Sequence, residues 1–458
     1  MTVRLLLFSS LVLLGCGSGG GSSSGPAQPL PTPSTDVGTP SPSAVQIPTP
    51  TPLVLPAGSL DPTFGSGGIV LVDVPSTLAT VRDFAIDAQD GLAILAQTID
   101  FDRGAQRQVG VLRLNADGSP RAAFGDDGFV ETAIAPKLAP CTERPCDDTP
   151  ASILLLPDDR VLVSASVDSR ALEPDRFRGV LVLYRADGTL DPTFGDAGLR
   201  SPSAGDLRFD SEGRIVGVTA AAGETTRRFA VMRLRADLEP DTTFGVDGIA
   251  SADAPTDNTH SFYLAASRAD GSVVVGGGVG LLGYRRPLIS AFTSDGVLDT
   301  SFGHDGFVTE FPPDLRFAAT EALIVDRAGR IVATLYDRLA RYSASGCLDP
   351  EFGDDGAVPI GFNANALLGS PDDRVLIAGS IGPGAGVLAR WDANGAPDAS
   401  FGDGGRSVLT TIEDHQVGFL SAVRDSRGRI VVLGEIFGQP DLRLFVARYL
   451  TEESTFPP

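Results

Sequence analysis

Most of the chain after residue 68 consists of short apolar runs separated by polar turns. Examples are Ile69-Val-Leu-Val72 and Val109-Gly-Val-Leu-Arg-Leu114, and such runs end near Gly, Asp or Asn. Short apolar runs bounded by turn residues are typical of β-strands, whereas an amphipathic helix needs a period of 3.6 over a longer stretch. The repeated part of the sequence shows no long run with that period. We therefore predict an all-β fold.

Seven polar turns within these runs predict β-hairpins, because Gly and Asp accept the positive φ of tight turns. The turns lie at Asp90-Gly91, Asp158-Asp159, Gly213, Asp270-Gly271, Gly329, Asp372-Asp373 and Gly428. Five of them are followed by an arginine: Arg160, Arg214, Arg330, Arg374 and Arg429. We expect these arginines to form ion pairs across their own turns. A ring of arginines that grips an anionic ligand is the alternative.

A second pattern recurs seven times and contains Phe, a Gly directly after it and a Gly four residues after the Phe. The Phe-Gly pairs are Phe64-Gly65, Phe124-Gly125, Phe194-Gly195, Phe244-Gly245, Phe302-Gly303, Phe352-Gly353 and Phe401-Gly402. We expect each Phe to pack between neighbouring repeats, where burial contributes about 1.5–3 kcal/mol. A role in stacking on a ligand is the alternative. The glycines provide positive φ and close backbone approach.

This Phe-Gly pattern resembles the delta-60 repeat, a family of bacterial surface and secreted proteins. The resemblance covers residues 58–450 and implies a β-propeller-like domain, but no common activity. The residues favour the same fold independently, because four strands in about 56 residues match the size of a propeller blade.

The order of the units predicts how the ring closes. The repeats begin with a lone Phe-Gly unit at residue 58 and end with three strands at about residues 420–450. Together these make one complete blade. We therefore predict a seven-bladed propeller of four-stranded blades, in which the amino-terminal strand pairs with the carboxy-terminal triplet.

The first 16 residues have the pattern of a signal peptide. Arg4 precedes an apolar stretch over residues 5–14, which is too short to cross a bilayer. It ends in Leu13-Leu14-Gly15-Cys16, which resembles the lipobox of bacterial lipoproteins. The resemblance implies that residues 1–15 are removed and that Cys16 receives a lipid. An ordinary secretory signal with a chance cysteine is the alternative.

Residues 16–57 contain glycine, serine, proline and threonine tracts and too few apolar residues to fold. We expect this segment to be a disordered linker between the lipid and the propeller, with residues 451–458 as a short tail. Gly17 follows the cysteine, which by resemblance to lipoprotein sorting favours the outer membrane. The expected location is the cell envelope, with membrane contact through the lipid alone.

Composition narrows the range of partners. The chain has 36 Lys+Arg and 58 Asp+Glu, a formal charge of −22. This charge argues against a nucleic-acid partner, which requires a basic surface. We expect a monomer with a protein or glycan partner.

Few residues in the sequence suggest a disulfide, a catalytic site or a metal site. Cys141 and Cys146 are expected to form a disulfide, since paired cysteines are common outside the cytoplasm. Neither a catalytic motif nor a metal motif is present, so we assign no catalytic, cofactor-binding or metal-binding residue. Asp clusters such as Asp126-Asp127 leave calcium open, although none matches an EF-hand loop.

Three functions remain open. The first is a lipid-anchored propeller that acts as a binding or scaffold module, and we expect no enzymatic activity from it. The second is an extracytoplasmic hydrolase or lyase with a site at the mouth of the channel. The third is a surface adhesin stabilised by calcium. Clustered carboxylates or histidines at the channel mouth would favour the second.

Overall fold

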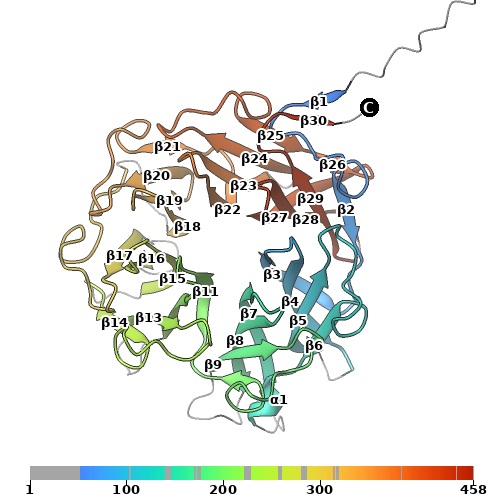
Figure 1. Cartoon of the computed structure of the whole chain (residues 1–458), viewed down its shortest axis with the longest axis vertical. Helices are drawn as coiled ribbons and strands as arrows, with labels where there is room; N and C mark the ends of the chain where they lie inside the picture. The colour runs from blue at the N-terminus through green and yellow to red at the C-terminus, as the bar shows by residue number, and fades with distance from the viewer. Residues whose placement is uncertain are drawn as a thin grey trace, which may run out of the picture. The chain divides into compact units, whose positions relative to one another are not determined.

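Short antiparallel strands make up most of the chain, as the apolar runs predict. The computed structural model describes residues 52–456, apart from 103–104, 140–145, 170–171, 173–176, 221–227, 256–259, 280–285, 313–314, 316–318, 383 and 440. The predicted signal peptide, Cys16, Cys141 and nearly all of the predicted linker lie outside the described residues. Within the unit that spans Thr51–Pro458, seven sheets surround a common centre (Figure 1).

Each sheet is one blade, and its strands follow one another in the sequence. Blade 1 comprises β3 (Leu78–Ile86), β4 (Leu92–Asp100), β5 (Gln106–Leu114) and β6 (Phe129–Thr132). Blade 2 comprises β7 (Cys146–Leu155), β8 (Val161–Ser169), β9 (Phe177–Tyr184) and β10 (Leu199–Arg200). Blade 3 comprises β11 (Ala204–Phe209), β12 (Ile215–Ala220), β13 (Arg228–Leu234) and β14 (Ile249–Asp253). Blade 4 comprises β15 (His260–Ser267), β16 (Val273–Val279) and β17 (Arg286–Phe292). Blade 5 comprises β18 (Thr320–Val325), β19 (Ile331–Leu335), β20 (Arg338–Tyr342) and β21 (Ala357–Pro359). Blade 6 comprises β22 (Asn363–Gly369), β23 (Val375–Ile381), β24 (Ala385–Trp391) and β25 (Arg406–Leu409). In blade 4 a bridge between Ser290 and Phe307 takes the place of the outer strand.

Blade 7 joins the two ends of the repeat region. It comprises β27 (His415–Arg424), β28 (Ile430–Ile436), β29 (Arg443–Tyr449) and, at its outer edge, β2 (Ile69–Val72), with the two-residue β26 (Thr411–Ile412) beside β27. The register pairs Ile69 with Ala447 and Val72 with Leu444. The first strand of every blade contacts the first strand of the next, and β27 contacts β3 to complete the circle. The predicted seven-bladed propeller, closed by the amino-terminal strand, is confirmed.

The sequence did not predict a second pairing of the chain ends. β1 (Leu53–Leu55) and β30 (Ser454–Phe456) form a two-stranded antiparallel ribbon. These residues fall in the segments expected to be linker and tail. The ribbon has no blade of its own, and Leu53 and Val54 stay about half exposed. α1 (Ala135–Leu138) is the single short α-helix among the described residues.

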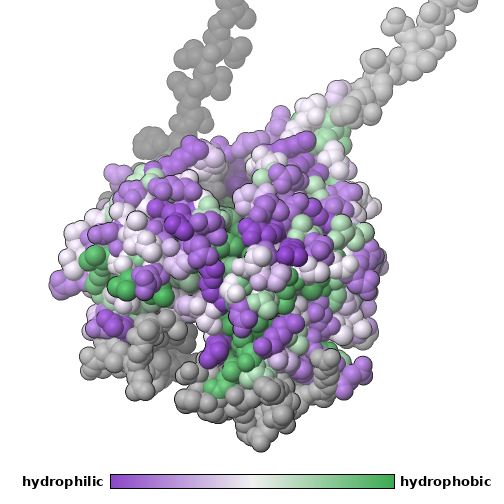
Figure 2. All heavy atoms as spheres, turned by 60° about the horizontal axis from the view of Figure 1, so that its bottom comes forward, coloured by the Kyte–Doolittle hydropathy of each residue, from purple (hydrophilic) through white to green (hydrophobic). Residues whose placement is uncertain are grey.

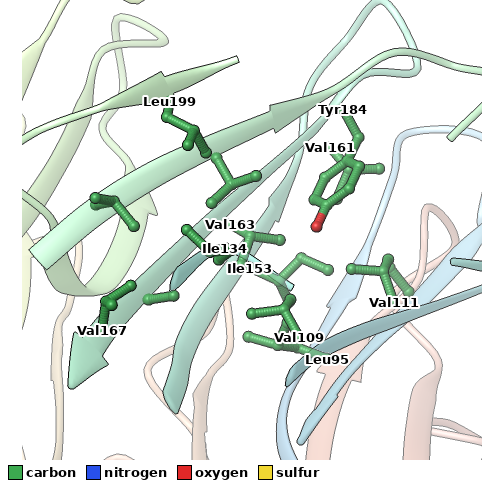
Figure 3. Packing of buried hydrophobic residues seen from close by; sticks show 14 of the residues in the cluster. Leu95, Val109, Val111, Ile134, Ile153, Val161, Val163, Val167, Tyr184 and Leu199 are labelled. Atoms are coloured by element: carbon green, nitrogen blue, oxygen red, sulfur yellow. The ribbon is translucent and has the colours of Figure 1, made fainter. Parts of the chain in front are cut away.

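The hydrophobic core is divided into seven clusters, and each lies between two neighbouring blades. One cluster joins Leu95, Val109 and Val111 of blade 1 to Ile153 and Val163 of blade 2 (Figure 3). Every cluster contains one Phe of the repeated Phe-Gly pattern. These seven side chains are at most 4% exposed, so each repeat supplies one aromatic ring to the contact between its blade and the next.

An arginine on the third strand accompanies several of these rings. In blade 3, Arg233 Nε lies 2.7 Å from Asp241 Oδ2, and the Arg233 guanidinium lies over the Phe244 ring at 4.3 Å. Corresponding arrangements join Arg341, Asp349 and Phe352; Arg390, Asp398 and Phe401; and Arg448, Asp61 and Phe64. The buried charge is therefore both paired and stacked on an aromatic face.

The five arginines that follow hairpin turns make the expected cross-turn ion pairs. Arg214, Arg330 and Arg429 contact the Asp at the start of their turns at 2.7, 2.6 and 2.6 Å. Arg160 and Arg374 contact the Asp two residues before them. Arg429 also lies 2.7 Å from Asp61, so the turn of blade 7 holds the amino-terminal unit as well.

Candidate channel site

The first strands of all seven blades line a cavity on the axis of the ring. The cavity has a volume of about 500 Å³. Its lining includes Asp83, Ile153, Asp206, Leu264, Glu321, Asn365 and Arg424, and each of the seven first strands contributes at least one residue. The cavity extends toward the hairpin turns that join first and second strands, because Ile86, Phe209 and Arg424 directly precede those turns. This volume falls in the range of small-ligand pockets.

Every first strand contains a break in its pairing at the level of the cavity. The register shifts lie between Val81 and Asp83, Pro150 and Ser152, Gly205 and Arg208, Phe262 and Leu264, Thr320 and Ala322, Ala364 and Ala366, and Phe419 and Ser421. A bulge of this kind twists a strand and redirects a side chain. Seven equivalent bulges therefore place non-equivalent side chains around one channel.

The wall formed by blades 1 to 3 is polar and occupied by contacts between blades. Asp83 Oδ2 accepts hydrogen bonds from Ser152 Oγ at 2.9 Å and from the Ile153 N–H at 2.8 Å. The Leu207 N–H donates to Ser152 Oγ at 3.0 Å. These contacts run in one direction around the ring, so each polar side chain binds the backbone of the following blade.

Asp206 makes the next of these contacts between blades, to blade 4, and also forms an ion pair with Arg208. Its Oδ2 accepts a hydrogen bond from the Ala265 N–H at 2.9 Å, and its Oδ1 lies 2.9 Å from a guanidinium nitrogen of Arg208. The Asp206 charge raises the pKa of Arg208. Burial raises the pKa of Asp83, although three hydrogen bonds oppose this effect.

The opposite wall has a different character. At the position of Asp83, blades 4 to 6 have Leu264, Ala322 and Ala366. Glu321 and Asn365 occupy the bulges of blades 5 and 6. The Glu321 side chain is exposed, partial desolvation raises its pKa, and no hydrogen bond or ion pair joins it to any residue that the structure describes. Asn365 Nδ2 donates to the Phe419 carbonyl at 2.6 Å, which leaves its side-chain oxygen free for a ligand.

Arg424 lies at the mouth of the cavity on blade 7. Its Nε donates to the Gly369 carbonyl at 2.9 Å and its Nη1 to the Gly428 carbonyl at 3.0 Å. Burial lowers its pKa, and Asp372 and Glu452 act on it only from beyond ion-pair distance. Among the described carboxylates, none forms an ion pair with Arg424.

The other described residues singled out from the sequence lie away from the channel cavity. Cys146 is buried at the start of β7, but its expected partner Cys141 falls outside the described residues, so the disulfide stays a prediction. Cys347 is exposed and free. The repeated Phe rings lie in the contacts between blades and not at the cavity lining.

Two of the three histidines have described side chains, and both lie outside the channel cavity. His304 lies exposed in a Phe-Gly turn beside Asp305, and His415 Nδ1 contacts the Glu413 carbonyl. No group of three or more His, Cys, Asp or Glu side chains suited to a metal occurs in the part of the chain that the structure describes. None of the helices in that part is long and apolar enough to span a membrane.

Comparison with known proteins agrees with this architecture. Residues 212–244, 268–302 and 370–401 match the family model described as a domain of unknown function (DUF5122) beta-propeller. Each matched segment runs from a hairpin turn, or the residues at its start, to a repeated Phe. No curated protein matches the chain.

The solved structures similar to this chain share little sequence identity with it. A polysaccharide lyase of family PL25, an ulvan lyase, shares 10% identity at a TM-score of 0.45, covering 87% of this chain and 96% of its own. The polysaccharide lyase Uly1 shares 10% identity at a TM-score of 0.47, covering 81% and 90%. A mutant Trypanosoma rangeli sialidase with trans-sialidase activity shares 12% identity at 0.44, covering 86% and 60%.

Proposed function

We propose that this protein is a lipid-anchored binding module of the cell envelope, and that its ligand enters the central channel. One observation carries the proposal: the channel cavity receives charged side chains from different blades, and neither Glu321 nor Arg424 forms an ion pair with a residue that the structure describes. Glu321 is exposed and Arg424 is half-buried at the cavity, so both charged side chains are available to a ligand that enters it.

The carboxylates at the channel favour binding over hydrolysis. Three of them line the cavity: Asp83, Asp206 and Glu321. Glycoside hydrolysis by the usual route requires two carboxyl groups that both face the substrate. Asp83 and Asp206 already accept hydrogen bonds from the neighbouring blade, and Glu321 alone is uncommitted among the described residues. A hydrolase or lyase remains the second candidate, because the raised pKa of Glu321 suits a general acid.

The anchor and the location form the other half of the proposal. The lipobox-like residues 13–16 and the glycine- and proline-rich linker support attachment through Cys16, with the outer membrane as the expected site. The ribbon of β1 and β30 supports this role, because it holds the point where the linker meets the propeller. The ligand derives from a protein or glycan of the envelope, and the propeller acts as a monomer.

A Trp placed in the channel tests the binding site. Ala366 lines the cavity, so Ala366→Trp is expected to fill it and to abolish capture of envelope components by the tagged protein. The matched control is Val408→Trp, because Val408 lies on the outer strand of the same blade and is 48% exposed. Capture is measured by mass spectrometry of the bound material, including its low-mass fraction.

The two Trp variants give a clear decision if both unfold cooperatively like the parent. Capture lost only in Ala366→Trp supports the channel. Equal capture by both variants would place the site elsewhere on the propeller. Should a captured glycan be cleaved by the parent and not by Glu321→Gln, the second candidate replaces the first.

A substitution at the lipobox tests the anchor. Cys16→Ala removes the thiol that would carry the lipid, so the variant is expected to lose incorporation of labelled palmitate and to leave the membrane fraction. The measurement is fluorography of the labelled protein together with fractionation of the envelope. Cys347→Ala is the control, since it removes an exposed thiol and should keep the label. Undiminished labelling of Cys16→Ala would refute the lipoprotein assignment.

A further inference from the structure

We propose that the channel recognises a short zwitterionic peptide, whose amino group pairs with Glu321 and whose carboxylate pairs with Arg424. The inference rests on the proposed binding function and names the chemical class of its ligand. Three adjacent blades provide the contacts: Glu321 from β18, Asn365 from β22 and Arg424 from β27.

The charges along the cavity leave one anion and one cation to be matched. Five ionisable residues line it: Asp83, Asp206, Arg208, Glu321 and Arg424. Asp206 and Arg208 neutralise each other at 2.9 Å, and Asp83 is fixed by hydrogen bonds from Ser152 and the Phe84 and Ile153 N–H groups. Glu321 has no hydrogen bond or ion pair with a described residue, and Arg424 binds only the Gly369 and Gly428 carbonyls, so these two charges remain for a ligand.

The two unmatched charges are separated along the channel axis. Glu321 lies at the bulge, five residues before the turn residue Asp326, whereas Arg424 directly precedes the equivalent turn residue Asp425. This offset of four residues corresponds to about 13 Å along a strand. The two side chains shorten the gap, and an extended tripeptide spans about 10 Å. A simple cation or anion would satisfy only one end.

The surface between the two charges suits small apolar side chains and a peptide backbone. Leu323, Ala366, Leu367 and Ala422 line the cavity at this level. The free oxygen of the Asn365 side chain lies on the blade between the two charges, where it can accept a hydrogen bond from a peptide N–H or an ammonium group. Trialanine combines these properties and is therefore the probe of choice.

The test is calorimetric titration of the whole protein with three peptides of equal length. Trialanine carries both charges, N-acetyl-trialanine lacks the ammonium group, and trialanine amide lacks the carboxylate. We expect trialanine to bind, and each modified peptide to bind about ten- to a hundredfold more weakly, as the loss of one charged hydrogen bond requires.

Two variants assign each charge to its partner. In Glu321→Gln, acetylation should no longer weaken binding, while amidation still does. In Arg424→Gln, the pattern should reverse. Glu435→Gln and Arg427→Gln are the matched controls, since Glu435 and Arg427 do not line the cavity, and both should behave like the parent. Thermal unfolding of all four variants identifies any that fails to fold.

The outcomes separate this inference from the proposed function. If N-acetyl-trialanine or trialanine amide binds the parent as tightly as trialanine, the assignment of that charge is wrong. If no peptide binds, yet envelope capture is still lost in Ala366→Trp, the channel is the site and the peptide inference is overturned. If capture is insensitive to Ala366→Trp, the proposed function fails as well.

Discussion

A chain that lacks residues 58–74 is expected to lose most of the free energy of unfolding of the propeller. This segment contains β2, the outer strand of blade 7, and the Phe64 ring, which is 2% exposed between blades 7 and 1. It also contains Asp61, which accepts contacts from Arg448 at 2.9 Å and from Arg429 at 2.7 Å. Its removal leaves one blade incomplete and the Arg448 guanidinium without its ion-pair carboxylate, whereas Arg429 keeps Asp425.

The expected size of the effect follows from these contacts. Loss of a buried Phe costs about 3–5 kcal/mol, and loss of one partner of a buried ion pair costs about 3–5 kcal/mol. Their sum is comparable with the whole net stability of about 5–15 kcal/mol that is typical of folded proteins. The backbone contacts of the closure, such as Gly58 N–H to the Leu450 carbonyl, are lost in addition.

Denaturant unfolding, followed by the fluorescence of Trp391, measures the effect. Trp391 is the single tryptophan of the chain and lies buried in blade 6, so it reports on a blade that the deletion does not remove. The control lacks residues 52–55 and therefore loses β1, which pairs only with β30. The control should unfold close to the parent. A parent-like midpoint for the variant lacking 58–74 would show that β2 does not lock the ring.

Arg233→Met is expected to lower the free energy of unfolding by about 3 kcal/mol, because it removes the nearer of the two guanidinium groups that pair with the buried Asp241 and leaves Arg214 at 4.0 Å. Arg233 is 1% exposed, donates to Asp241 at 2.7 Å and stacks on Phe244 at 4.3 Å. It also donates to the Gly271 carbonyl at 3.2 Å, which lies in the turn of the next blade. One substitution therefore weakens both the turn and the contact between blades 3 and 4.

Arg235→Met is the matched control two residues away. Arg235 contacts Asp237 at 3.0 Å, but the two side chains are 52% and 59% exposed, and exposed pairs contribute little. Denaturant unfolding of the two variants should differ clearly, with Arg235→Met indistinguishable from the parent. Equal stabilities for the two variants would mean that the Arg-Asp-Phe arrangement does not stabilise the blades.

The sequence was sufficient for the fold because each blade repeats the same local information. The seven Phe-Gly units and seven hairpin turns predict strand number and order, and the split of one blade between the chain ends predicts the closure by β2. The third-strand arginines were missed, although the signal was available: Arg113, Arg233, Arg341, Arg390 and Arg448 occupy the same place before the next repeat unit. The Asp three residues before the Phe is the partner of four of them.

The channel site could not be predicted in the same way. Glu321, Asn365 and Arg424 are far apart in the sequence and belong to no motif, and only the ring brings their strands together. The bulges that redirect the first strands depend on pairing with the second strands, so they leave no mark in the hydrophobic pattern. Departures from the repeat on the inner strands, rather than the recurrent turns, therefore provide the residues of the candidate site.

Hydrogen–deuterium exchange of the protein, with and without its captured ligand, tests the central claim most directly. If the ligand enters the channel, protection should increase in the inner strands β18, β22 and β27, which supply Glu321, Asn365 and Arg424, and should change little in the outer strands of the same blades. Protection confined to the outer strands β21, β25 and β2, with the inner strands unchanged, would contradict the assignment of the channel as the binding site.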